Sequence, residues 1–490
     1  MKQLKVLAGQ TVIYGLSSII GRLINYLLVP VYTRVFLPAE FGIVTEMYAY
    51  VAFFAVLLTY GMETAFFRFI NSESNPQKVY STSVITLFTT SFLFIILISI
   101  FSHQIASLLR YYSHPEYVIW FAWIVALDAC TIIPFAKLRA ENKPSRFALI
   151  KLLNIFTNVI MNLCFIFVFP WLVKSGFINE NITLGIIYNG KATVSAVFIS
   201  NLIASAITVL LLMPEFLKVK FEWSRLLLKK MLIYSLPLMI AGFAGIVNET
   251  VDRILIKYLL PENVSMTQLG IYGACYKISI LMTIFIQAFK YAAEPFFFYN
   301  AKEKEAPQLY ALVMKYFVIA VSFIFLAIMM YIDIVILFVG KNFREGIKVI
   351  PILLLANLFL GVYYNLSIWY KLTNKTYYGA YIAVIGAIAT LILNFLLIPV
   401  MGYLGAAWAT FICYALMMII SYFIGQKHYF VNYEIKTLII YISAAVGFYF
   451  ISLFLKTNNN VINFIINTLF LISFVIIVLL KEFKKNIRNP

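Results

Sequence analysis

Apolar residues recur along this sequence in runs of about 20 positions, the length that a helix needs to cross about 30 Å of hydrocarbon. Short polar segments separate the runs, and no stretch has the pattern of a soluble domain. We therefore expect an all-α polytopic membrane protein. The fourteen predicted spans are residues 10–32, 42–66, 81–101, 117–136, 147–169, 194–213, 232–257, 270–298, 312–338, 349–370, 378–399, 403–425, 436–455 and 461–480. Asp333 interrupts the ninth, which fits either one tilted helix or a helix with a re-entrant piece.

Composition supports this class of protein. Hydrophobic residues make up 63% of the chain and charged residues 12%, whereas soluble domains carry about 25% charged residues. The N-terminal run has no small-residue cleavage site, so we expect an uncleaved first helix. The cysteines lie within apolar runs and share no spacing, which argues against a disulfide framework or a metal site. They are Cys130, Cys164, Cys275 and Cys413.

The net charge of the chain is +18, and the predicted membrane topology explains most of it. With the N-terminus in the cytoplasm, most Lys and Arg residues fall on cytoplasmic segments, as the positive-inside rule requires. We therefore expect both termini in the cytoplasm. The remaining basic residues are explained by attraction to anionic membrane lipids. A nucleic-acid partner is therefore not predicted.

The two halves of the sequence carry matching residues in the same order. A glycine opens the second and eighth spans, at Gly42 and Gly270. Further residues recur at an offset of 231 or 232, namely Tyr60, Glu63, Phe66, Asn142 and Asn162 with Tyr291, Glu294, Phe297, Asn374 and Asn394. Because matching spans enter the membrane from the same side, we predict parallel repeats with a pseudo-twofold axis along the membrane normal. The predicted parts are a six-helix lobe at 1–215, a second at 216–430, and two further helices at 431–490.

Several short motifs follow one another from the first span to the seventh. They are Gly21-Arg22, Arg34 with Leu37-Pro38, Phe41-Gly42, Leu138-Arg139-Ala140-Glu141-Asn142-Lys143, Ser235-Leu236-Pro237-Leu238 and Asp252-Arg253-Ile254-Leu255-Ile256. In this order the chain resembles the Wzx-type polysaccharide flippases of the MOP (multidrug, oligosaccharidyl-lipid, polysaccharide) exporter superfamily. The resemblance does not single out the branch that moves peptidoglycan precursors, whose first span looks richer in arginine.

The resemblance implies a flippase of a bacterial cytoplasmic (inner) membrane. Such a protein moves a polyprenyl-pyrophosphate-linked oligosaccharide from the cytoplasmic to the periplasmic leaflet by alternating access, for O-antigen, capsule or exopolysaccharide assembly. The implied partners are this lipid-linked oligosaccharide, membrane lipids and glycan polymerase or assembly enzymes, with the chain itself a monomer. No cofactor is expected. The sugar, and whether Na⁺ or H⁺ drives transport, are left open.

Cationic side chains within the spans are the candidates for binding the phosphates of such a substrate. Arg22 shares a polar helix face with Asn25, and its planar donor fork suits phosphate; a structural ion pair is the alternative. Arg253 is a further candidate. Lys277 has no acid nearby, although it could instead extend to the headgroups. Lys290 has Glu294 one turn away and could form an ordinary pair.

Acidic residues in the spans are candidates for gating or coupling: Glu63, Glu249, Asp252 and Glu294. Glu63 and Glu294 occupy equivalent positions, so we expect a shared role at a cytoplasmic gate, with helix-end pairing as the alternative. Glu249 can pair with Arg253 four residues on, and Asp252 with a base on another helix. The isolated Asp128 has no basic neighbour at helical spacing.

The seventh span is expected to be a flexible gate whose charges balance. Pro237, Gly242 and Gly245 interrupt its apolar pattern and would let it bend. Its acidic residues, Glu249 and Asp252, are matched by Arg253 and Lys257. The duplication makes Lys257 the counterpart of Arg34, a helix-end residue.

Other functions are less consistent with the sequence. The histidines His103, His114 and His428 lie in loops or at helix ends, and no phosphate-binding loop or metal-ligand cluster occurs, so we do not expect an enzyme. A membrane-embedded glycan-assembly enzyme should have a large acidic outer loop, but the predicted loop at 170–193 holds one acid, Glu180. A cation-coupled drug or small-molecule antiporter of the same superfamily is the stronger alternative, although those relatives usually have twelve spans.

Overall fold

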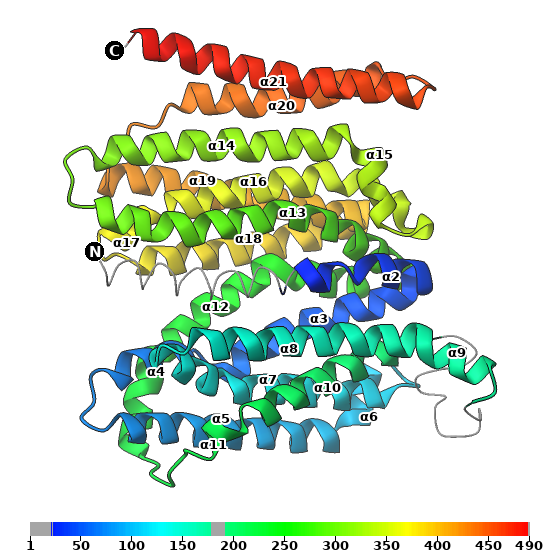
Figure 1. Cartoon of the computed structure of the whole chain (residues 1–490), viewed down its shortest axis with the longest axis vertical. Coiled ribbons are helices and arrows are strands. Elements are labelled where there is room, and N and C mark those ends of the chain that lie inside the picture. The colour runs from blue at the N-terminus through cyan, green and yellow to red at the C-terminus, as the bar shows by residue number, and fades with distance from the viewer. Residues whose placement is uncertain (1–20, 22, 178–191, 489–490) are drawn as a thin grey trace. The chain divides into compact units, whose positions relative to one another are not determined.

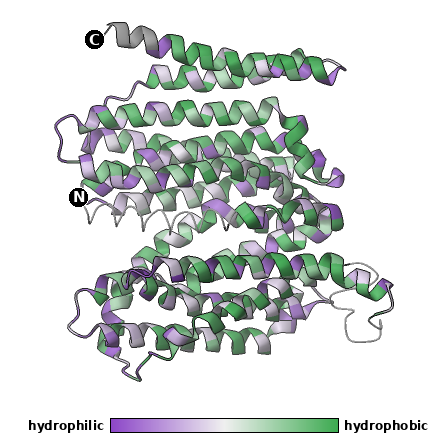
Figure 2. Ribbon diagram, in the orientation of Figure 1, coloured by the Kyte–Doolittle hydropathy of each residue, from purple (hydrophilic) through white to green (hydrophobic). Residues whose placement is uncertain are grey.

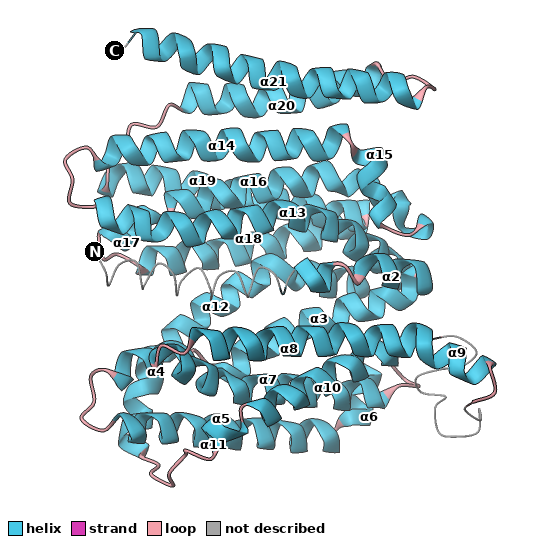
Figure 3. Cartoon of the chain, in the orientation of Figure 1, coloured by secondary structure: helices cyan, strands magenta, loops and turns pink. Residues whose placement is uncertain are grey.

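The computed structural model describes residue 21, residues 23–177 and residues 192–488, with side chains described to residue 482. All of its described elements are helices (Figure 3). Twelve are long and apolar enough to cross a membrane, and shorter apolar helices lie at Leu23–Val35 and Ser195–Leu211, where the first and sixth spans were predicted. Polar residues gather mainly at helix ends and loops (Figure 2). The predicted all-α polytopic fold is confirmed.

Contacts divide the chain into a first unit, Met1–Gly270, and a second unit, Ile271–Pro490. The helices of the first unit are α2 (Val29–Val35), α3 (Pro38–Thr59), α4 (Met62–Ile70), α5 (Pro76–Ile100), α6 (Ser102–Leu108), α7 (Pro115–Ala140), α8 (Pro144–Leu163), a π-helical turn (Cys164–Val168), α9 (Phe169–Lys174), α10 (Ser195–Leu211), α11 (Met213–Phe216) and α12 (Arg225–Leu259). Helix α13 (Glu262–Asn300) begins in this unit and continues into the next.

The helices of the second unit follow α13 in the order shown in Figure 1. They are α14 (Ala306–Met330), α15 (Ile332–Val335), 3₁₀ turns at Ile336–Phe338 and Lys341–Lys348, α16 (Val349–Leu366), α17 (Ile368–Leu372), α18 (Tyr377–Met401), α19 (Tyr403–His428), α20 (Ile435–Phe454) and α21 (Asn460–Arg488). The ninth span is therefore one helix, α14, followed by short helical turns. The chain leaves the helix at Tyr331, just before Asp333.

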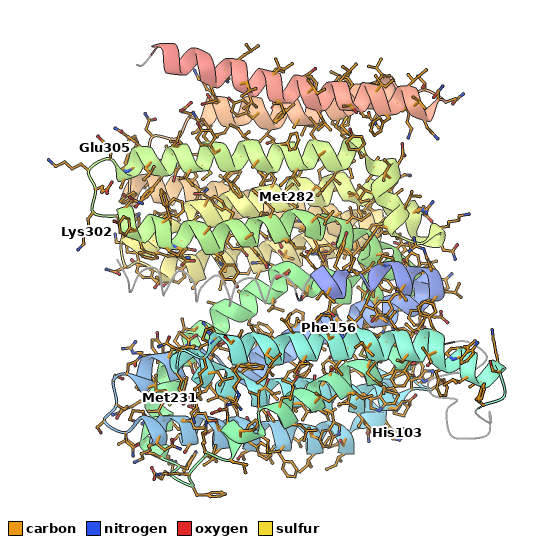
Figure 4. The ribbon with its side chains drawn as sticks, in the orientation of Figure 1. His103, Phe156, Met231, Met282, Lys302 and Glu305 are labelled. Carbon is orange, nitrogen blue, oxygen red and sulfur yellow. The ribbon has the colours of Figure 1, made fainter. Side chains whose placement is uncertain are left out.

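Each unit has its own apolar core. In the first unit, Met62, Phe66 and Tyr80 pack with Met231 of α12, and α12 also packs along α3. In the second unit, α16 packs between α14 and α19. Figure 4 labels one fully buried methionine in each unit, Met231 and Met282. The seventh span therefore has most of its contacts in the first unit, which extends to Gly270. The second sequence repeat, by contrast, was predicted to begin at residue 216.

The repeated Asn-Lys motif forms the same helix end twice. Asn142 and Asn374 have left-handed backbones, with φ of 55° and 56°. The next residue closes the turn in both cases, from Lys143 N to Leu138 O at 2.9 Å and from Lys375 N to Tyr370 O at 2.8 Å. Asparagine tolerates this conformation better than most residues, which explains why it recurs at the end of a helix.

The two repeats differ where the second span ends. The predicted span at 42–66 is broken between α3 and α4, because Tyr60 and Gly61 both have positive φ, 35° and 70°. Their counterparts Tyr291 and Ala292 continue within α13. A glycine accepts the left-handed conformation without strain, whereas alanine does not. The break gives the first repeat a bend that its partner lacks.

A charged cluster around the buried Lys315 connects the last two helices to α14. The ammonium group of Lys315, on α14, contacts the carboxylates of Glu434 and Glu482. Tyr441 of α20 donates a 2.8 Å hydrogen bond to Glu482 of α21. Figure 1 shows α20 and α21 running beside α14. A polar contact thus supplements the apolar packing of this helix pair.

Candidate functional site

The candidate residue Arg22 lies outside the described residues, so its predicted phosphate contact stays a prediction. Its neighbour Asn25 is exposed and lies 3.4 Å from the amide nitrogen of Asn158 on α8. Asn158 in turn accepts a 3.0 Å hydrogen bond from Asn162, whose oxygen accepts one from Tyr32 at 2.8 Å. Asn25 therefore borders a chain of hydrogen-bonded amides on α8.

The charged residues of the seventh span differ in their surroundings. Asp252 is buried and accepts a 2.8 Å hydrogen bond from the backbone N–H of Arg253, which is half-buried. Glu249 is exposed and forms no ion pair with any residue in the described part of the chain. The predicted Glu249–Arg253 pair is therefore not formed. The two side chains lie in different environments, one exposed and one partly packed.

A buried ion pair that the sequence did not predict joins α3 to α12. The Nζ of Lys257 lies 3.0 and 2.8 Å from the two carboxylate oxygens of Glu46 and 2.5 Å from the carbonyl oxygen of Leu109. The side chains of Lys257 and Glu46 are 3% and 0% exposed. Lys257 lies in the last turn of α12 as Arg34 lies in the last turn of α2, so its prediction as a helix-end residue is confirmed. The two differ in burial, because Lys257 is buried and Arg34 is exposed. The available signal was Glu46 itself, the one acid in the apolar stretch 41–62.

Tyrosines complete this buried cluster. Tyr111 donates a hydrogen bond to Glu46, and the Lys257 ammonium lies 3.8 Å from the Tyr111 ring centroid. Burial first, and then the negative charge of Glu46, raise the pKa of Tyr111 well above its usual value, so its hydroxyl stays protonated and can donate. At the edge of the cluster, Arg110 lies 3.6 Å from Glu262. The arrangement neutralises two charges that are removed from water.

The equivalent acids Glu63 and Glu294 form equivalent ion pairs, each inside its own unit. Glu63 accepts a 2.6 Å bond from Arg139, and Glu294 accepts a 2.8 Å bond from Lys371. Arg139 and Lys371 are themselves 232 positions apart in the sequence. The duplication has therefore preserved both members of the pair. The equal offset of Arg139 and Lys371 was therefore a sequence signal from which both ion pairs could have been predicted.

The structure does not support the predicted pairing of Lys290 with Glu294, because Lys371 of α17 occupies that carboxylate. The Nζ of Lys290 instead lies 4.8 Å from the centroid of the Tyr364 ring. Lys277, by contrast, is half-buried in the first half of α13. Lys290 and Lys371 line one pocket of the second unit together with Asn365.

Two other acids have partners that sequence spacing could not show. Asp128 accepts a 2.8 Å hydrogen bond from Ser205 of α10, so it is not isolated. Glu215 is fully buried and contacts Arg146 and Lys218 at 2.9 Å. Burial would raise the pKa of Glu215, but its hydrogen bond with Lys218 and the neighbouring positive charges hold it below the usual value. The stability that this carboxylate contributes is therefore present at neutral pH and is lost as the pH falls below its unfolded-state value of about 4.3.

Comparisons with known proteins identify the sequence family and similar folds. A family model described as polysaccharide biosynthesis protein matches residues 7–300, and no curated protein matches the chain significantly. The lipid II flippase MurJ, in an inward closed conformation, is 14% identical with a TM-score of 0.72, covering 96% of this chain and 100% of that one.

Two MATE transporters are also similar in fold. An inward-facing MATE transporter of the MOP superfamily is 14% identical with a TM-score of 0.61, covering 83% of this chain and 94% of that one. A mutant of the Vibrio cholerae MATE transporter VcmN is 12% identical with a TM-score of 0.58, covering 87% and 96%. These likenesses establish the fold. Because the family model covers more than half of the sequence, the chain belongs to the polysaccharide biosynthesis protein family.

Proposed function

We propose that this protein is a flippase for a polyprenyl-pyrophosphate-linked oligosaccharide, which it moves from the cytoplasmic to the periplasmic leaflet by alternating access. One observation carries the proposal. The match to a polysaccharide biosynthesis family falls on a chain that has the fold of a lipid II flippase over 96% of its length. The MATE structures cover only 83–87% of the chain, so the flippase fold accounts for more of it.

The remaining parts of the proposal follow from the sequence. The protein acts as a monomer in a bacterial inner membrane, with both termini in the cytoplasm, and serves O-antigen, capsule or exopolysaccharide assembly beside glycan polymerases. Arg22, Asn25, Arg253, Lys277 and Lys290 contact the substrate. The acids proposed for gating or coupling are Glu63, Glu249, Asp252 and Glu294.

Transport of a lipid-linked oligosaccharide is the direct test. We expect the wild-type chain to restore surface glycan in a strain that lacks its own flippase, and Arg22→Ala to abolish that glycan while its amount in the membrane stays normal. The matched control is Lys302→Ala, which removes an exposed cation in the loop after α13 (Figure 4). No restoration by wild-type protein would contradict the function, and wild-type glycan from Arg22→Ala would contradict the role of Arg22 alone.

The second candidate function is cation-coupled drug or small-molecule antiport, which the likeness to MATE transporters favours. It predicts that expression of this chain lowers the susceptibility of cells to cationic drugs. Glycan restoration without any change in drug susceptibility would separate the two functions.

A flexible α12 is expected to be necessary for transport. Pro237 lies within α12, a Cβ at Gly242 would meet only Val56 at 3.7 Å, and a Cβ at Gly245 would meet nothing within 4 Å. Alanine therefore fits at both positions, and each change favours the helix by about 1 kcal/mol. We expect Gly242→Ala/Gly245→Ala to slow transport severalfold without lowering thermal stability. Gly447→Ala in α20, which also has open space, is the control; equal transport by both variants would argue against the gate.

A further inference from the structure

A pocket in the second unit lies between the end of α13 and the segment that joins α16 to α17. Its polar lining consists of Lys290, Glu294, Tyr364, Asn365, Ser367 and Lys371. The pocket is a partly open hollow of about 300 Å³, a volume that includes the open solvent at its mouth. Phe289, Ala293 and Phe297 of α13 supply its apolar wall. A polar group on a larger molecule can therefore approach this lining from the open side.

The charges of this pocket leave one cation in excess. Glu294 is neutralised by Lys371 at 2.8 Å. Lys290 is exposed, and its Nζ lies 4.8 Å from the centroid of the Tyr364 ring. It forms no ion pair with a residue that the structure describes, and Glu294 is the single carboxylate in the lining. The pocket therefore carries a net positive charge.

An unpaired buried donor in the same pocket points to a missing acceptor. Asn365 is 4% exposed, and its side-chain nitrogen Nδ2 has no hydrogen-bond partner in the described structure. Leaving such a donor unsatisfied is unfavourable, and native proteins rarely do so without a ligand or water. A cation and an unpaired N–H donor lining one pocket form a suitable site for an oxyanion.

The first repeat shows that neither group is required to build the fold. At the same sequence offsets it keeps the ion pair, as Glu63 with Arg139. It replaces Lys290 with Thr59, whose hydroxyl bonds its own helix at Ala55 O. The position of Asn365 is taken by Ile133, which is fully buried. The cation and the unpaired amide are therefore additions that only the second repeat carries.

We propose that this pocket binds a phosphoryl oxyanion, with Lys290 supplying the charge and Asn365 Nδ2 donating a hydrogen bond to a phosphate oxygen. The inference rests on the proposed function, in which the oxyanion is the diphosphate of the lipid carrier. In the orientation proposed above, this end of α13 faces the cytoplasm, where such a substrate is loaded. The site would therefore hold the substrate before it crosses the membrane.

Binding of a short-chain polyprenyl diphosphate to the purified full chain tests the site. We expect Lys290→Met to weaken binding about tenfold, as the loss of a charge-assisted contact predicts. Asn365→Leu should weaken it severalfold while leaving the melting temperature unchanged or higher, because it removes the unpaired donor. Lys302→Met, in an exposed loop, should bind like wild type. Wild-type affinity in both Lys290→Met and Asn365→Leu would overturn the proposal.

Two further measurements identify the source of the oxyanion and separate this inference from the function. Phosphatidylglycerol should compete with the diphosphate poorly; competition at equal concentration would make the pocket a headgroup site and overturn the assignment to the carrier. If wild type restores glycan and both pocket variants do so equally well, the inference fails and the function stands. If the variants lose diphosphate binding but wild type restores no glycan, the function fails and the oxyanion site stands.

Discussion

Replacing Lys257 with methionine is expected to destabilise the protein by about 3–5 kcal/mol, the cost of leaving one member of a buried ion pair uncompensated. Glu46 would then be a buried carboxylate without its cation, held by neutral hydroxyl donors such as Tyr111. The change should appear as a large fall in the melting temperature of the detergent-solubilised protein.

A second variant distinguishes lost charge balance from lost packing. Glu46→Gln/Lys257→Met removes both charges and should recover most of the stability, because an uncharged pair of similar volume replaces the ions. The matched control is the exposed pair of Lys456 and Asp333, also 2.8 Å apart. Lys456→Met should cost no more than about 1 kcal/mol. A Lys257→Met protein as stable as this control would show that the buried pair has little effect on folding.

Gly270→Val is expected to have a comparably large effect, because the starts of α3 and α13 touch through their backbones. A Cβ at Gly270 would lie 1.8 Å from the carbonyl oxygen of Pro38, and one at Gly42 would lie 2.3 Å from the carbonyl oxygen of Met266. Neither backbone atom can rotate away as a side chain can, so the helices must separate. We expect a loss of about 3 kcal/mol or more, above the usual range for overpacking.

The same contact can be tested from both sides. Gly42→Ala and Gly270→Ala should each lower the melting temperature, and their combination should cost less than the sum, because one separation of the helices relieves both overlaps. Gly447→Ala, with open space around it, reports the effect of the substitution alone. Full additivity of the two variants would mean that the glycines act independently.

Sequence reasoning was most successful where one physical constraint acts on many residues. The thickness of the hydrocarbon sets the length of each apolar run, so the spans could be located. The recurring Asn142 and Asn374 likewise mark a conformation that few residues tolerate, and the structure shows the same helix end at both. Such features need no knowledge of which helices are neighbours.

Individual polar partners could not be predicted in the same way. Lys257 and Glu46 are 211 positions apart, and helical spacing says nothing about contacts between helices. Lys290 and Glu294 have the ideal spacing for a pair, yet a lysine from α17 competes successfully for the carboxylate. Spacing along a single helix therefore identified candidate residues. Which of them form pairs depends on the packing of helices that are distant in sequence.

The ion pair between Lys315 of α14 and Glu482 of α21 has a consequence for biosynthesis. Lys315 is made 167 residues before its partner Glu482, which at 5–20 residues per second is a delay of roughly 8–33 s. During that time α14 is already synthesised with a cation on the side that later becomes buried. A ribosome that stops before α21 would release a chain with this lysine incompletely neutralised. In such a chain Glu434 remains as the acidic partner of Lys315, at 3.7 Å.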